Sequence, residues 1–80
     1  MVQDTFYLVH TLIERDGEAS DCHMLYSTLD KAKAAMRTEI EDAMENFSQG
    51  KVVHDLERLY EFRNEDGYGF TVGIDELKLL

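Results

Sequence analysis

The residues of this chain that could bind a metal ion or act as nucleophiles are one cysteine and three histidines. Cys22 and His23 are adjacent, and His10 lies in an earlier segment that alternates like a β-strand. A zinc site needs three or four ligands that converge on one point. Because adjacent residues of a strand point to opposite faces of a sheet, Cys22 and His23 cannot both face His10. We therefore expect no metal site, and no motif in the sequence indicates a cofactor.

Cys22 is also a poor candidate for a catalytic nucleophile. A reactive cysteine needs a histidine base close to its sulfur and surroundings that favour the thiolate. His23 should face away from Cys22, and the acids nearby in the sequence disfavour a negatively charged thiolate. Those acids are Glu14, Asp16, Glu18 and Asp21.

Two other catalytic arrangements lack support. Among 17 acidic residues some pair will always lie at a distance that suits acid–base catalysis, but a domain of 80 residues rarely encloses a pocket for a substrate. Gly67-Tyr68-Gly69 follows a turn instead of opening a helix, so it does not match a phosphate-binding loop. The sequence predicts a non-catalytic protein, since an enzyme of this size would need an active site shared between subunits.

The charge balance restricts the partners that the chain can bind. It has 8 Lys and Arg residues against 17 Asp and Glu residues, which gives a formal net charge of −9. Nucleic-acid-binding surfaces need cations that displace counterions from phosphates, and anionic membranes also attract cations. Aromatic residues such as Tyr7, Tyr60 and Phe70 lack the basic surroundings of a base-stacking platform. We expect neither direct nucleic-acid binding nor membrane binding.

The composition predicts one soluble unit. A single cysteine allows no intramolecular disulfide, which favours a reducing compartment. Asp4 stands where a signal peptide would be basic, and no apolar run is long enough to cross a membrane. With 44% apolar residues and no proline, the chain shows no sign of disorder or of a linker. We expect a single compact α+β domain over residues 1–80, located in the cytoplasm.

The first half of the chain predicts a β-hairpin followed by a helix. Residues 5–14 and 22–26 favour strands, with a long polar turn at 15–21 between them. Both faces of the first strand carry apolar residues, which predicts a strand that is central or covered on both sides. Ser27 is the expected helix N-cap, Asp30 completes a weak capping box, and Gly50 lies just after the helix. The stripe that should face the sheet is Leu29, Ala32, Met36, Ile40, Ala43 and Phe47.

The second half predicts further strands around one ambiguous segment. Residues 51–58 fit both strand and helix spacing, and we favour one strand over residues 52–63. Glu65-Asp66-Gly67 predicts a tight turn before a strand over residues 68–74. The order β-β-α-β-β indicates an α+β fold: a single antiparallel β-sheet with one amphipathic helix packed on one face. The predicted core is Phe6, Leu8, Leu12, Tyr26, Leu29, Met36, Ile40, Phe47, Tyr60, Phe62, Phe70, Val72 and Ile74.

The charges of the predicted helix are inverted with respect to its dipole. The first half carries Lys31, Lys33 and Arg37 and the second half carries acids, whereas the dipole favours the reverse. A local rule broken without structural gain indicates a function, although an acidic surface also keeps a protein soluble. The candidate partner-binding residues are the helix acids Glu39, Glu41, Asp42 and Glu45 and the turn acids Glu14, Asp16, Glu18, Asp21, Glu65 and Asp66.

The first functional hypothesis is a small acidic interaction module that binds a basic protein and covers its nucleic-acid-binding surface. In size, charge and layout the chain is similar to compact acidic inhibitors of CRISPR or restriction systems, which phages and mobile elements encode, although no motif carries this likeness. The alternative is a structural or regulatory subunit that self-associates through its sheet face or edge, for example as a homodimer. The small residues Gly69, Thr71 and Gly73 would leave that face flat and open.

Overall fold

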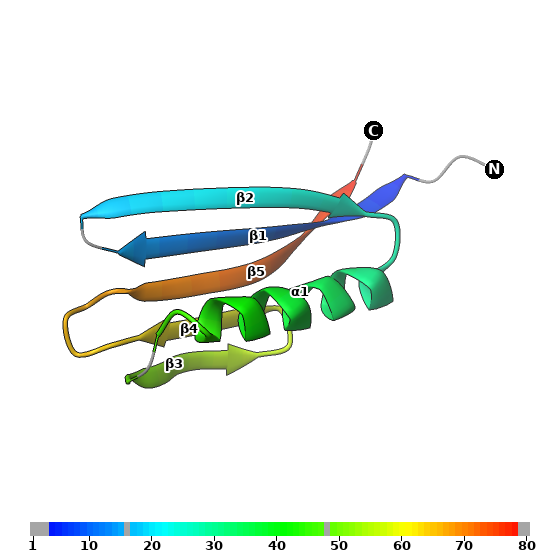
Figure 1. Ribbon diagram of the computed structural model, residues 1–80. Coiled ribbons are helices and arrows are strands. Elements are labelled where there is room, and N and C mark those ends of the chain that lie inside the picture. Colours follow the sequence, from blue (N-terminus) through cyan, green and yellow to red (C-terminus); the bar gives the residue numbers. More distant parts are fainter. Residues whose placement is uncertain (1–3, 16, 48, 79–80) are drawn as a thin grey trace.

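One antiparallel sheet and one helix make up the protein, as the computed structural model shows for residues 4–15, 17–47 and 49–78 (Figure 1). This arrangement confirms the α+β class. Within these residues, the single helix is too short and too polar to cross a membrane. In chain order the elements are β1 (Thr5–Arg15), β2 (Glu18–Tyr26), α1 (Leu29–Met44), β3 (Lys51–Leu56), β4 (Leu59–Arg63) and β5 (Gly69–Lys78).

The last strand of the chain occupies the centre of the sheet. The strand order is β2-β1-β5-β4-β3, and all neighbouring strands are antiparallel. Strands β1 and β5 form the longest ladder, which runs from Thr5 opposite Lys78 to Glu14 opposite Gly69. The helix contacts β1, β5 and β2 on one face. Strands β2 and β3 are left as the two edges of the sheet.

The single strand expected over residues 52–63 is in fact two strands. Strands β3 and β4 are joined by a two-residue turn, Glu57-Arg58, and a bulge shifts their register between Val52 and His54. The segment extends the sheet on one side of β5, because β4 pairs with β5 and β3 folds back onto β4. The turn contains none of the Gly, Pro, Asn or Asp residues that usually mark a hairpin, which is why the sequence pattern did not reveal it.

The first hairpin and the helix caps also differ from expectation. Strand β2 begins at Glu18, so the turn is short and Gly17 adopts a φ of 80° in it. The N-cap is Thr28, whose hydroxyl accepts a hydrogen bond from the Lys31 N–H at 3.2 Å; the expected cap, Ser27, precedes it. The helix ends at Met44, with Glu45 as C-cap. Phe47 therefore lies beyond the helix, although its side chain is buried in the core.

The buried face of β1 is opposite to the one predicted. Val9 and Thr11 are buried there, whereas Phe6, Leu8 and Leu12 lie on the other face and are half-buried. Both faces of β1 are apolar, so the pattern alone could not decide which face the helix covers. The other predicted core residues lie in the core or pack against it: Met36, Phe47, Phe62, Phe70, Val72 and Ile74 are buried, and Tyr26, Leu29, Ile40 and Tyr60 are half-buried.

The core is centred on Phe70 in the middle strand. Its side chain has no exposed area, and its ring lies between 5.7 and 5.9 Å from those of Phe62, Phe47 and Tyr60, measured between centroids. Offset and tilted aromatic contacts of this kind add to the stabilisation from buried apolar area. Met36 and Ala32 bring the helix onto this cluster, since both are buried.

The substitution Met36→Asp should abolish cooperative folding. It would bury an unpaired carboxylate under the sheet. The cost of burying that charge is comparable to the whole free energy of unfolding of a domain of this size, which is roughly 4–12 kcal/mol. Thr38→Asp introduces the same charge at an exposed position of the same helix and should melt close to the parent. Circular dichroism melts of the two variants check this. If Met36→Asp melts like the parent, Met36 does not face the sheet and the buried face of the helix is misassigned.

Candidate protein-interaction surfaces

The second half of α1 presents an unpaired acidic surface, which we call the acidic arc and define as Glu41, Asp42 and Glu45. All three residues are exposed, and the last helical turn contains no basic residue. None of the ion pairs in the described part of the chain includes their carboxylates. Glu39, the fourth predicted helix acid, is half-buried beside the arc. The acids therefore lie at the negative end of the helix dipole without compensation.

One cation in the basic half of the helix is paired with an acid of the sheet. Lys33 forms an ion pair with Glu57 in the β3–β4 turn. The hydrogen bond from Lys33, followed by its charge, holds the pKa of Glu57 below its ordinary value. Figure 1 shows this turn beside the middle part of α1. Glu41 lines the same shallow pocket as Lys33 and Glu57, so the acidic arc begins close to this ion pair.

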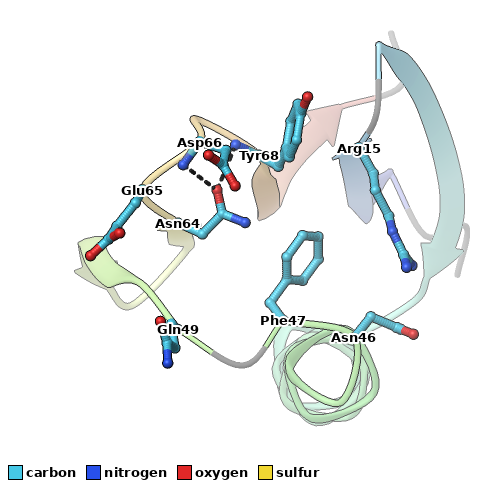
Figure 2. A pocket seen from close by; sticks show the side chains of 8 residues that line it. All are labelled: Arg15, Asn46, Phe47, Gln49, Asn64, Glu65, Asp66 and Tyr68. Carbon is cyan, nitrogen blue, oxygen red and sulfur yellow. Dashed lines mark hydrogen bonds between the residues drawn. The ribbon is translucent and has the colours of Figure 1, made fainter.

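Two hairpin turns lie at the same end of the sheet as the C-terminal end of α1 (Figure 1). They come together because β1 and β5 are antiparallel, with Glu14 opposite Gly69. A shallow pocket of about 350 Å³ lies between the turns and the helix end. Its lining residues are Arg15, Asn46, Phe47, Gln49, Asn64, Glu65, Asp66 and Tyr68 (Figure 2).

The β4–β5 turn in this pocket is held by one side-chain amide. Figure 2 shows Asn64 Oδ1 accepting hydrogen bonds from the backbone N–H groups of Asp66, at 2.9 Å, and Tyr68, at 3.0 Å. Gly67 completes the turn with a φ of 83°. This geometry keeps the backbone beside Glu65 and Asp66 fixed. Because Arg15 lines the same pocket, the charge there is mixed.

The predicted site residues do not form one patch. Glu18 lies near Asp66, since both line a second shallow pocket between the two turns. Glu14 lies on the sheet face away from the helix, where Arg63 Nη2 donates to its Oε1 at 2.9 Å. Asp21 belongs to edge strand β2 on that same face and not to a turn. Asp16 lies outside the described residues.

The sheet face opposite α1 contains Gly69, Thr71 and Gly73, the residues on which the self-association hypothesis is based, and it also carries exposed apolar residues. We call it the open face. Residues opposite each other in register share a face, so its members follow from the strand pairing. They are Phe6, Leu8, His10, Leu12 and Glu14 in β1; Ala19, Asp21, His23 and Leu25 in β2; Gly69, Thr71, Gly73, Asp75 and Leu77 in β5; Leu59, Glu61 and Arg63 in β4; and Lys51, His54 and Leu56 in β3.

Several polar groups on the open face contact one another. Arg63 lies between Glu14 and Glu61, with a 2.9 Å hydrogen bond to each. The hydrogen bond to Glu61, and then that to Glu14, raise the pKa of Arg63 above its ordinary value. His10 Nε2 is 3.3 Å from an Asp75 carboxylate oxygen, and His54 Nε2 is 3.8 Å from one of Glu61.

Gly73 is required where the His10 ring crosses the central strand. A Cβ atom at this position would lie 2.5 Å from His10 Cε1, which is closer than side chains approach one another. This close contact explains why position 73, one of the three small residues noted in the sequence, is a glycine. A Cβ on Gly69 would meet the backbone of Phe62, so this second glycine reflects the approach of another strand.

The alternation of Cys22 and His23 is as predicted. His23 lies on the open face next to His10, with 6.4 Å between ring centroids, whereas Cys22 lies on the opposite face of β2 and is exposed. Across residues 4–15, 17–47 and 49–78, no group of three or more His, Cys, Asp or Glu side chains is arranged to hold a metal ion.

Comparison of the chain with protein-family models, with curated proteins and with solved structures finds no significant match.

Replacing the acidic arc with lysines should leave the fold intact. In the variant Glu41→Lys/Asp42→Lys/Glu45→Lys, cations replace anions near the C-terminal end of the helix, where the dipole contributes about 0.3–1 kcal/mol per charge. The free energy of unfolding should therefore stay unchanged or rise slightly. Urea denaturation of parent and variant measures it. A clear loss of stability would mean that these carboxylates have a structural role that their exposure does not reveal.

Proposed function

We propose that this chain is a non-catalytic interaction module whose acidic arc binds a basic protein and covers a nucleic-acid-binding surface of that protein. The observation that carries the proposal is the set of unpaired, exposed carboxylates at the negative end of α1, where they cost helix stability. A feature that opposes folding is maintained most readily when binding needs it.

The charge spacing on the helix supports a basic, nucleic-acid-binding partner. From Glu39 to Glu45 four acids extend along about 9 Å of helix axis, at 1.5 Å per residue. Duplex DNA carries one phosphate charge per about 1.7 Å, so the helix has a lower charge density of the same order. A groove lined with Lys and Arg residues can accept such a surface in place of phosphates. The proposed setting is the cytoplasm, and inhibitors of CRISPR or restriction systems from phages and mobile elements are the proposed type.

In this proposal further acids at the same end of the sheet assist the acidic arc. Glu65 and Asp66 lie in the β4–β5 turn, which Asn64 holds, and Glu18 at the start of β2 lies near Asp66. A fixed backbone loses little conformational entropy on binding. Glu14 and Asp21 lie on the open face, so we assign them no part in this contact.

Affinity capture with matched charge variants tests the proposal. The bait is the immobilised full chain, used as parent, as Glu41→Lys/Glu45→Lys and as Asp4→Lys/Glu76→Lys. The two variants have the same net charge, but Asp4 and Glu76 are exposed residues at the opposite end of the sheet. We expect parent and control to retain one basic nucleic-acid-binding protein from extracts of the producing cells. The helix variant should lose at least about tenfold in affinity, because attractions become repulsions.

Competition then decides whether the partner's nucleic-acid site is covered. Duplex DNA or RNA added to the captured complex should release the partner, and raised salt should weaken the complex. Equal losses for both variants would show that only net charge matters. Simultaneous binding of nucleic acid and this chain to the partner would refute the proposed occlusion.

A further inference from the structure

The two edges of the sheet differ in how open they are to a further strand. Strand β3 has six residues, carries Lys51 and contains a bulge between Val52 and His54, and each of these features hinders pairing along an edge. Strand β2 has nine residues, all of which pair with β1 in an unbroken register. It contains no Lys, Arg or Pro. Edge β2 is therefore the less protected of the two.

The outer side of β2 presents backbone groups to which a strand can be added. The Ile74 N–H donates to the Arg58 carbonyl oxygen at 2.9 Å, so the backbone groups of Ile74 face β4. Val9 lies opposite Ile74 and must then face β2, where it is opposite Met24. Figure 1 shows β2 as the outermost strand, and no strand of the described chain lies beyond it. Because the direction alternates along a strand, the residues whose N–H and C=O groups point outward are Ala19, Asp21, His23 and Leu25.

The sequence of β2 is complementary to itself about its midpoint, Cys22. If a second copy adds antiparallel with a two-fold axis at Cys22, Asp21 lies opposite the partner's His23. An imidazole N–H can donate to a carboxylate opposite it. Ala19 lies opposite the partner's Leu25, whose side chain is 54% exposed in the single chain. All nine residues overlap, and no like charges lie directly opposite each other.

Neighbouring registers fit less well. An axis at Asp21 would set two carboxylates opposite each other, which is unfavourable. An axis at His23 would limit the overlap to residues 20–26 and set Asp21 against Leu25. With the axis at Cys22 the outward-facing residues pair with one another and exchange about eight backbone hydrogen bonds. Such backbone bonds supply the affinity when a strand is added to a sheet edge.

We infer that β2 binds β2 of a second copy of this chain, antiparallel and with the two-fold axis at Cys22, so that two five-stranded sheets join into one. The acidic arc takes no part in this contact. The chain beyond the C-terminal end of α1 packs on the other half of the sheet, where Phe47 contacts Phe62 in β4 and Phe70 in β5. The inference therefore does not depend on the proposed function, and either one can fail alone.

Sedimentation equilibrium of the full chain tests the dimer. The parent should sediment as a species of twice 9.3 kDa. His23→Asp should weaken the dimer at least about tenfold, because it sets a carboxylate opposite Asp21 in both symmetric pairs. His54→Asp makes the same exchange on edge β3 and should associate like the parent. A parent that is monomeric at about 1 mM, or a His23→Asp variant that associates like the parent, would overturn the inference.

A charge reversal separates a lost contact from a damaged fold. Adding Asp21→Lys to His23→Asp restores an opposite-charge pair across the axis and should restore the dimer. Adding Glu76→Lys to His23→Asp changes the net charge equally, at an exposed position on the central strand β5, and should restore nothing. Failure of the Asp21→Lys rescue, or an equal rescue by Glu76→Lys, would refute the proposed register.

Oxidation of Cys22 tests the position of the axis. In the dimer the two Cys22 Cα atoms form a non-hydrogen-bonded pair about 4.5 Å apart, which is within the range of a disulfide. Diamide accepts the two electrons and two protons of the thiols and should link the dimeric parent rapidly. In Ser20→Cys/Cys22→Ser the thiol stays on the same face of β2, but the two sulfur-bearing residues are about 14 Å apart along the strands, so linkage should be at least about tenfold slower. Equal rates of linkage would exclude an axis at Cys22.

Discussion

The packing of one helix against one face of the sheet determines the rest of this structure. Phe70 lies at the centre of that contact. It belongs to β5, which is the last strand in the sequence and the middle strand of the sheet. Three of the four strand pairings join consecutive strands, but β5 must also enter between β4 and β1, and its pairing with β1 joins the two ends of the described chain. The helix reaches β1, β5 and β2, and it can cover only one of the two faces of the sheet.

Sequence patterns predicted the elements whose signal is local. The helical stripe through Ala32 and Met36 and the Asp-Gly turn at residues 66–67 each depend on a few neighbouring residues, and both are present in the structure. The side of β1 that faces the helix was not predictable in this way. Residues 5–14 carry apolar side chains at both odd and even positions. Only the position of α1 decides that Val9 and Thr11 are buried instead of Leu8 and Leu12.

The candidate surfaces show the same division between local and long-range information. The exposure of Glu41, Asp42 and Glu45 follows from helical periodicity, so the sequence was sufficient to locate the acidic arc. The open face needs the register of five strands, including a turn at residues 57–58 without a typical signature. Apolar residues on both faces of β1 predicted a strand that is central or covered on both sides. In the structure β1 lies between β2 and β5, and the helix covers one of its faces.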